Sequence, residues 1–202
     1  MLKEVVVIKV QKARLSFPRL FVPKAFSVGQ KPRYEATFLL DPSNKEHAAT
    51  IAQIKAEAKR VATEKWNDKI PKNLHKCYGT AEEMGKEYDG YAGMFCIASA
   101  NKRRPRVLNR DRSDIVEDNG ELYAGCYVNG SIDLWAWDYR DPESGKILKQ
   151  GINANLRGVQ KNSDGESFGV RPADVEEEFD ALEDDGDSNH AKAASASDDW
   201  DV

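Results

Sequence analysis

One stretch of the chain, residues 122–160, constrains the fold more than any other. In the two-residue alternation of a β-strand, one face of its first half carries small or apolar side chains: Cys126, Val128, Gly130, Ile132, Leu134 and Ala136. The opposite face is polar, yet it displays large aromatic rings: Tyr127, Trp135, Trp137 and Tyr139. A turn at residues 141–145 precedes a second alternating segment that ends at residue 160, so the stretch is predicted to be a hairpin with one dry face and one wet face. Rings on the wet face favour a platform on which flat ligands such as nucleobases stack.

The rest of the body predicts further strands and one helix. Residues 5–17 and 33–40 read as strands, the first with Val5, Val7 and Leu15 on its buried side, and the proline-rich residues 18–32 read as a loop between them. Ser43 followed by Glu46 has capping-box spacing, and the helix that begins there is expected to cover about residues 43–68. Residues 91–100 are apolar on both faces and are predicted to be a central strand, whereas residues 71–90 read as irregular. Five strands in all make this a mainly β domain.

Charge divides the chain into two parts. The full chain of 202 residues has a net charge of −4, but residues 1–172 hold 29 Lys and Arg against 22 Asp and Glu. Residues 173–202 hold 1 against 12, in a composition too polar to form a core. We therefore expect a basic domain at residues 1–172 and a disordered acidic tail at residues 173–202, an asymmetry typical of proteins that bind polyanions.

Several protein classes are disfavoured. The chain has no run of about 18 apolar residues and its N-terminus lacks the features of a secretion signal, so we expect no contact with a membrane and a cytoplasmic location. Three widely spaced cysteines do not suggest a disulfide scaffold or a zinc site. No phosphate-binding loop, nucleophile elbow or metalloprotease helix is present, and we expect neither an enzyme nor a cofactor.

Two weak catalytic alternatives stay open at this point. His75 and Cys77 are spaced so that they could share a metal ion, although the sequence offers no second pair of ligands. The pairs Asp111 with Asp114 and Asp138 with Asp141 are the carboxylates that a magnesium-dependent single-strand nuclease would use. Acidic residues near turns are more commonly solvated, so a metal site is not expected.

Binding to single-stranded nucleic acid explains more of the sequence, because it requires a cationic path for phosphates and sequence-tolerant stacking surfaces. The densest basic cluster follows the third strand, and the predicted phosphate contacts are Lys102, Arg103, Arg104 and Arg106, with Arg14, Arg33 and Arg157 in addition. The predicted stacking rings are Trp135, Trp137 and Tyr139, with Tyr127, Phe17 and Phe21 in addition. Two alternatives are a solvated loop for the basic cluster and a dry dimer interface for the rings. Readout of double-stranded DNA is less favoured because no basic recognition helix is visible.

The chain also resembles a known family. The segments that carry the resemblance are Ala-Arg-Leu-Ser-Phe-Pro at residues 13–18, Tyr-Ala-Gly-Cys-Tyr-Val-Asn at 123–129, Gly-Ile-Asn-Ala-Asn-Leu-Arg-Gly-Val-Gln at 151–160, and residues 165–169. They are similar to bacteriophage single-stranded-DNA-binding proteins that consist of one OB-fold and an acidic C-terminal tail. The resemblance implies a five-stranded OB-type β-barrel with an inserted helix, and a role in phage DNA replication, recombination or repair in the cytoplasm of the bacterial host.

The acidic tail at residues 173–202 is expected to regulate DNA binding. A flexible polyanion tethered beside a cationic surface competes with DNA at high effective concentration, and DNA binding releases it for other proteins. Its end, Asp198, Asp199, Trp200 and Asp201, offers replication and recombination proteins an apolar ring among carboxylates. A homodimer or cooperative assembly on DNA is compatible with this reading. The rival class is a structural or scaffold protein that uses the aromatic face as its dimer interface.

Overall fold

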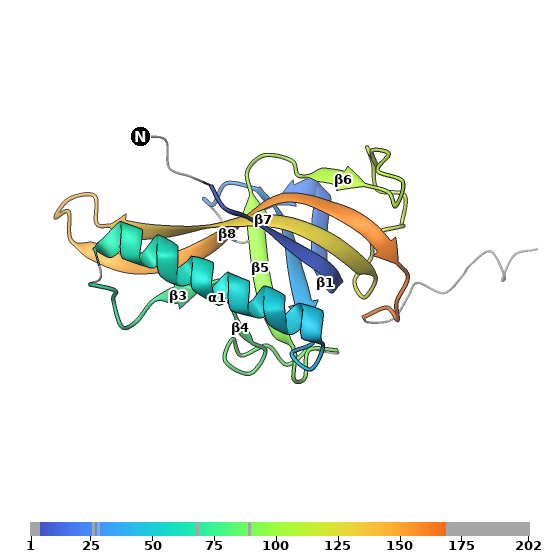
Figure 1. The fold of residues 1–202 in the computed structure, drawn as a ribbon. Coiled ribbons are helices and arrows are strands. Elements are labelled where there is room, and N and C mark those ends of the chain that lie inside the picture. Colours follow the sequence, from blue (N-terminus) through green and yellow to red (C-terminus); the bar gives the residue numbers. More distant parts are fainter. Residues whose placement is uncertain (1–4, 26, 28, 68, 89, 169–202) are drawn as a thin grey trace, which may run out of the picture. The chain divides into compact units, whose positions relative to one another are not determined.

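In the computed structural model, which describes residues 5–25, 27, 29–67, 69–88 and 90–168, five long strands close into a ring (Figure 1). Around the ring, β8 pairs with β7, β7 with β1, β1 with β2, and β2 with β5, all antiparallel. A parallel pairing of β5 with β8, at Ser99 with Ala154 and Ala100 with Asn155, completes the closure. This is the strand order of an OB-type barrel, and the predicted fold class is confirmed. The elements are β1 Val7–Lys24, β2 Arg33–Leu40, α1 Lys45–Trp66, β3 His75–Lys76, β4 Tyr78–Thr80, β5 Phe95–Asn101, β6 Arg106–Leu108, β7 Tyr127–Arg140 and β8 Ile147–Ser163.

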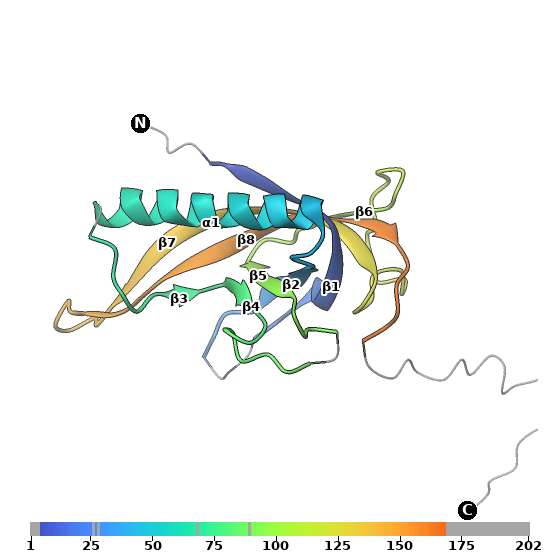
Figure 2. The same cartoon turned by 60° about the horizontal axis from the view of Figure 1, so that its bottom comes forward.

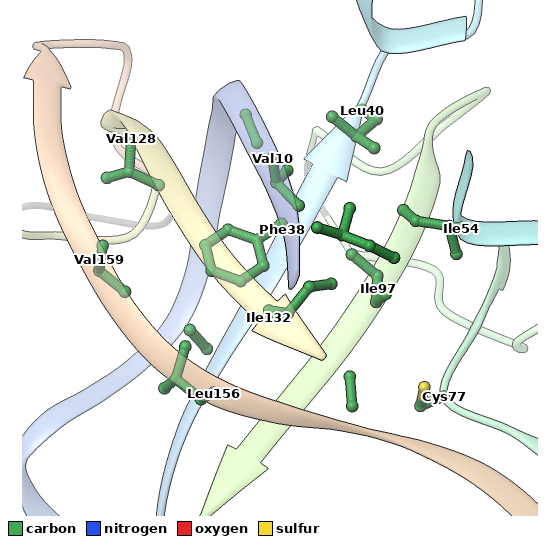
Figure 3. Close-up of a cluster of buried hydrophobic side chains, with 14 of the residues drawn as sticks. Val10, Phe38, Leu40, Ile54, Cys77, Ile97, Val128, Ile132, Leu156 and Val159 are labelled. Atoms are coloured by element: carbon green, nitrogen blue, oxygen red, sulfur yellow. The ribbon is translucent and has the colours of Figure 1, made fainter. Parts of the chain in front are cut away.

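The core fills the interior of the ring mainly with aliphatic side chains, together with Phe38 and Phe95 (Figure 3). Val10, Phe38, Ile97, Ile132 and Leu156 come from five different strands and are 0% exposed. Phe38 lies directly over Gly130, where an added Cβ would stand 2.5 Å from the ring. The glycine on the dry face of the predicted hairpin is therefore required by the close approach of this ring.

The helix α1 lies between β2 and β5 in sequence and covers one end of the barrel (Figure 2). Ile51, Ile54, Ala58 and Val61 form its buried face. Its N-cap is Asn44 rather than Ser43, because the Asn44 side chain accepts the backbone N–H groups of Glu46 and His47 while Ser43 is hydrogen-bonded to Asp41. The helix ends where Asn67 adopts a left-handed conformation with φ 49°.

The first strand differs from its prediction in both alternation and length. Ile8 and Val10 point into the core, while Val5 and Val7 are exposed. Lys12 then adopts φ 49° in a β-bulge, which shifts the alternation so that Leu15 returns to the core. A second irregularity at Phe17, with φ 47°, turns that ring outward, and the strand continues through residues 18–24, which had been predicted to be loop.

The apolar residues on both faces of β5 are explained by two separate packing layers. Phe95 and Ile97 face the interior, whereas Cys96 packs outside against Leu39 and Tyr91. A further segment, β3 and β4, bridges the gap where β5 and β8 diverge: the N–H of Cys77 donates to Ile152 at 3.1 Å, and the N–H of Ala98 donates to Cys77 at 2.8 Å. Part of the stretch predicted to be irregular, residues 75–80, therefore forms two short strands.

Within the part of the chain that the structure describes, no helix combines the length and the apolar character needed to span a membrane.

Candidate nucleic-acid interface

The pairing register aligns one residue from each of four strands on the exterior of the barrel. Asn155 on β8 is paired with Ala100 on β5, Ala100 with Glu35 on β2, and Glu35 with Arg19 on β1. Paired residues point to the same side of a sheet, so these four side chains form one row across four strands. We call this row the exterior floor. Its first two members are short side chains that leave the backbone close to the surface, which suits an extended ligand lying across the strands.

A row of cations borders the exterior floor. Lys24 is paired with Arg33. Lys102 follows Asn101, which is paired with Tyr34, so Lys102 lies beside Arg33, and Arg157 lies two residues beyond Asn155 on β8. We call Lys24, Arg33, Lys102 and Arg157 the cationic margin; all of them are exposed. The structure therefore brings together three cations that the sequence analysis had selected separately, and it adds Lys24.

The aromatic rings of the β7–β8 hairpin lie on the face turned away from α1. Asp138 points toward the helix, where its carboxylate accepts the indole N–H of Trp66 at 2.8 Å and pairs with Lys65 at 3.2 Å. Trp135 and Tyr139, at positions of the opposite parity, are 40% and 53% exposed. This confirms the two faces predicted for the hairpin.

Trp137 is more covered than its two neighbours. It is paired with Gly151, and an added Cβ there would lie 2.8 Å from Cζ2 of the indole, so the ring lies across the glycine of the neighbouring strand. The ring of His75 lies beyond it, with centroids 6.3 Å apart. The indole N–H of Trp137 is buried without a hydrogen-bond partner among the described residues. We call Trp135, Trp137 and Tyr139 on this surface the hairpin platform.

Three residues beside the hairpin platform escaped the sequence analysis. Lys149 is paired with Tyr139, and His75 and Lys76 are exposed on β3, which is paired with β8 at Gly151 and Ile152. Counting outward from the turn at residues 141–145 would not have placed Lys149 opposite Tyr139, because the register shifts between Tyr139 and Arg140. His75 and Lys76 could not be placed beside the platform from the sequence either, because β3 is only two residues long.

The basic cluster that follows β5 does not act as one unit. Lys102 and Arg103 are exposed and make no ion pair with any described residue. Arg106 is paired with Asp114 at 2.8 Å, and the hydrogen bond from Arg106 lowers the pKa of that carboxyl group. Arg104 donates to the carbonyl of Val116 and lies 5.4 Å from the ring centroid of Phe21. Lys102 and Arg103 are therefore the members best placed for phosphate contacts.

Arg14 and Tyr127 lie apart from the cationic margin and have packing roles. The guanidinium of Arg14 donates to the carbonyls of Gly125 and Glu166 and lies 4.2 Å from the ring centroid of Phe168 and 5.7 Å from that of Tyr127. Phe17 meets Tyr88 edge to face at a centroid distance of 5.2 Å. Arg14 thus packs Glu166 and Phe168 against the barrel, and its predicted contact with phosphate stays a prediction.

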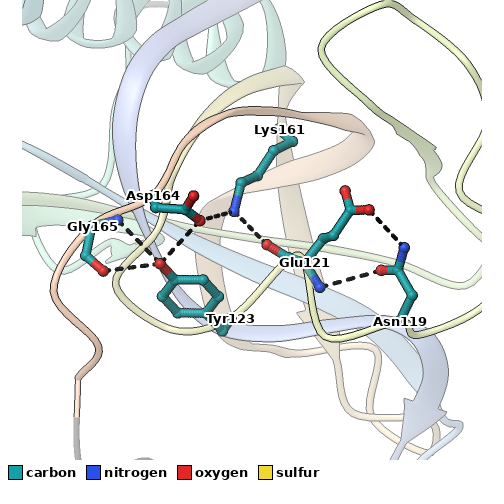
Figure 4. Close-up of polar contacts among 6 residues, drawn as sticks. All are labelled: Asn119, Glu121, Tyr123, Lys161, Asp164 and Gly165. Atoms are coloured by element: carbon teal, nitrogen blue, oxygen red, sulfur yellow. Dashed lines mark hydrogen bonds and ion pairs between the residues drawn. The ribbon is translucent and has the colours of Figure 1, made fainter.

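A buried lysine reinforces this attachment (Figure 4). Lys161 is 8% exposed, donates to Asp164 and to the carbonyl of Glu121 at 2.6 Å each, and lies 4.9 Å from the ring centroid of Tyr123. The hydroxyl of Tyr123 in turn donates to the carbonyl of Gly165 at 3.0 Å. These contacts fix the end of the described chain. The predicted partner-binding residues Asp198, Asp199, Trp200 and Asp201 lie outside the described residues.

The carboxylates suggested for a nuclease are engaged in turns and ion pairs. Asp111 accepts hydrogen bonds from Ser113, and Asp141 accepts them from Ser144, which lowers the pKa of each carboxyl group. Burial raises the pKa of Cys77 to about 12, so this thiol is a poor partner for His75 in a metal site. Among the described residues, no group of three or more His, Cys, Asp or Glu side chains is arranged to hold a metal ion.

Comparison with known proteins adds a family. A family model described as "Enterobacter phage Enc34, ssDNA-binding protein" matches residues 5–189. Among curated proteins, p50 of Acyrthosiphon pisum secondary endosymbiont phage 1 is 36% identical over 185 residues, which cover 87% of this chain and 93% of the relative.

Solved structures show the same similarity. The single-stranded DNA-binding protein from bacteriophage Enc34 in complex with ssDNA has a TM-score of 0.69 and 28% identity, over 81% of this chain and 89% of that chain. A second structure of the single-stranded DNA-binding protein from bacteriophage Enc34 has a TM-score of 0.63 and 27% identity, over 86% of this chain and 90% of that chain. The single-stranded DNA binding protein gp2.5 of bacteriophage T7, with a TM-score of 0.50 and 11% identity over 95% and 100%, shares the fold.

Proposed function

Because the chain belongs to the family of phage single-stranded-DNA-binding proteins represented by that of Enterobacter phage Enc34, we propose that it binds single-stranded DNA across the exterior floor, largely without sequence preference. The floor lies between the hairpin platform and the cationic margin. A strand laid across it has its bases directed toward the rings and its phosphates toward the cations. Aromatic rings for the bases and cations for the phosphates are the two kinds of group that sequence-tolerant binding of single strands requires.

The single observation that carries this proposal is the register of β5 with its neighbours. It pairs Asn155 with Ala100, and it pairs Asn101, which precedes Lys102, with Tyr34, which follows Arg33, although these residues come from three strands far apart in sequence. β2 and β5 are the second and third strands of the barrel, and OB-folds commonly bind oligonucleotides on this face. The relatives' known ligand and the surface chemistry of this chain thus agree.

The biological role follows from the ligand. We assign residues 1–172 to the DNA-binding domain and residues 173–202 to a tail that competes with DNA and recruits replication or recombination proteins. The protein coats exposed strands during replication, recombination or repair in the cytoplasm of the infected bacterium, as a binding protein without catalytic activity. Dimers or cooperative assemblies on the strand fit the same role.

A titration of labelled oligo-dT at several salt concentrations tests the proposal. We expect tight binding at low salt and a log–log slope of about −0.7 for each phosphate that the protein neutralises. Removal of residues 173–202 is expected to tighten binding at low salt, because it removes 12 acidic residues. Absence of binding, or binding that salt does not weaken, contradicts the proposal; an unchanged affinity after truncation contradicts only the competing tail. Incubation of the DNA with protein and magnesium is the control for nuclease activity.

A further inference from the structure

A cavity of about 210 Å³ opens between the second half of β1 and the loop that leads into β7. Leu20, Phe21, Val22 and Leu122 give it apolar walls, and Arg19 and Asp118 add one polar group of each sign. Leu20 and Leu122 are buried, while Val22 is 76% exposed and stands at the opening. At about 30 Å³ per water molecule, the space equals roughly seven waters, which is enough for one heterocyclic ring system.

The cavity lies at the end of the exterior floor. Arg19, the last member of that row, is one of its lining residues. Arg104 lies at 5.4 Å from the Phe21 ring centroid and donates to Val116, so a cation stands beside the opening. A single strand that crosses the floor therefore reaches the cavity beside the guanidinium of Arg104.

Asp118 decides which group the cavity accepts. One of its oxygens accepts the N–H of Gly120 at 3.2 Å, and the carboxylate makes no other hydrogen bond with a described residue. Asp118 is exposed, and a carboxylate offers about four acceptor positions, so its remaining positions are open to solvent or to a ligand. Its negative charge disfavours a phosphate and the aspartate-rich end of the acidic tail, and it favours a planar group that carries adjacent N–H donors.

Among the four bases, guanine presents two adjacent N–H donors, N1–H and the N2 amino group, on one edge. A carboxylate can accept both at once, in the bidentate geometry that makes charge-assisted pairs strong and selective. Thymine offers one N–H between two carbonyl oxygens, and adenine and cytosine offer one amino group beside an acceptor nitrogen. The apolar walls around Phe21 accommodate the ring faces of any base, so the selectivity comes from Asp118.

We propose that this cavity binds one guanine base of the single-stranded DNA, with Asp118 as the residue that selects it. The inference rests on the proposed function, because a free base would lack the backbone contacts that bring it to the cavity. It adds a base-selective position to an interface that is otherwise tolerant of sequence.

The test compares labelled oligo-dT with the same oligonucleotide carrying a single central dG, at one fixed salt concentration. We expect the dG substitution to tighten binding by at least about fivefold, the lower end for a bidentate contact to a base edge. Inosine, which lacks the N2 amino group, is expected to recover only part of this gain. In Asp118→Asn the dG and all-dT oligonucleotides are expected to bind alike, with the all-dT affinity retained.

Glu117→Gln is the matched control, because Glu117 is an exposed carboxylate on the same loop that does not line the cavity. It is expected to keep the preference for dG. The inference is overturned if wild-type protein binds all-dT firmly without a preference for dG, or if the preference survives in Asp118→Asn. Failure to bind all-dT at all contradicts the proposed function instead, so the two failures are distinguishable.

Discussion

The hairpin platform and the cationic margin lie on opposite sides of the exterior floor, and the chain positions their side chains in opposite ways. The central ring of the platform is held by a short contact, because Trp137 lies across Gly151, and the strand that carries all three rings is fixed to α1 through Asp138. The cations are exposed, and within the margin only Arg157 has an ion pair with a described residue, at 3.2 Å to Asp133. One side is thus preorganised, while the other keeps its conformational freedom.

This difference separates two kinds of binding energy. Stacking acts at contact distance and depends on the position of each ring, whereas phosphate contacts act over a Debye length of about 8–10 Å and are screened by salt. We therefore expect substitutions on the platform to weaken binding at every salt concentration. Substitutions on the margin are expected to change the dependence on salt.

The largest effect is expected from the platform. Trp135→Ala and Trp137→Ala should each weaken binding of oligo-dT by about 1–3 kcal/mol, because each removes a stacking surface. The salt slope should stay unchanged, and circular dichroism should show a folded domain. Unfolding of both variants would instead assign these rings to the core.

Gly151→Ala sharpens this test while keeping both tryptophans. Its new Cβ would stand 2.6 Å from the backbone oxygen of His75 and 2.8 Å from the Trp137 indole, so the ring must leave its position. The affinity of Gly151→Ala for oligo-dT should lie between that of wild type and that of Trp137→Ala. Affinity equal to wild type would show that the position of Trp137 across Gly151 is unimportant.

A smaller effect, and one of a different kind, is expected on the margin. Lys102→Ala and Arg33→Ala should each reduce the magnitude of the salt slope by about 0.7, since each removes one phosphate contact. Joint replacement of Arg106 and Asp114 by alanine removes a neutral ion pair and should leave the slope unchanged. If the salt slope of the joint variant falls as much as that of Lys102→Ala, then Arg106 also contacts phosphate, and its separation from Lys102 and Arg103 is wrong.

The smallest effect on DNA binding is expected from Glu35, which lies on the exterior floor between the hairpin platform and the cationic margin. Burial raises the pKa of Glu35 despite the nearby Arg19 and Arg33. The folded protein therefore holds this proton to higher pH than the unfolded chain, and the associated stability is lost as pH rises through the raised pKa. Glu35→Gln should bind oligo-dT up to about fivefold more tightly at neutral pH and unfold at a slightly higher temperature. Wild-type affinity should rise as pH falls through that pKa, and the variant should lack this rise.

The sequence predicted the hairpin well because a strand with one buried face has a regular alternation. Val128, Ile132 and Leu134 are buried and Trp135 is exposed, as expected. The same reasoning failed in β1, because the bulge at Lys12 and the irregularity at Phe17 place non-glycine residues at positive φ, for which their side chains give no signal. A single unrecognised bulge reversed the faces assigned to Val5 and Val7.

The candidate interface was only partly accessible from the sequence. Lys102 and Arg103 were found as a local cluster, but the alignment of Lys102 with Arg33 and Lys24 depends on the register between strands that are distant in the chain. Alternation within one strand does not determine that register. The packing role of Arg14 was likewise invisible, because its partners Gly125, Glu166 and Phe168 lie far along the chain.

The position of β8 as the last strand also determines when the protein can fold. β8 pairs with β7, β5, β3 and β6, so four separate pairings depend on the final segment of the barrel. During synthesis, the apolar faces of β1, β2 and β5 emerge from the ribosome long before residues 147–163 are available to close the ring. Because such long-range pairing slows folding and leaves strand edges exposed, we expect the nascent chain to depend on chaperones until β8 is complete.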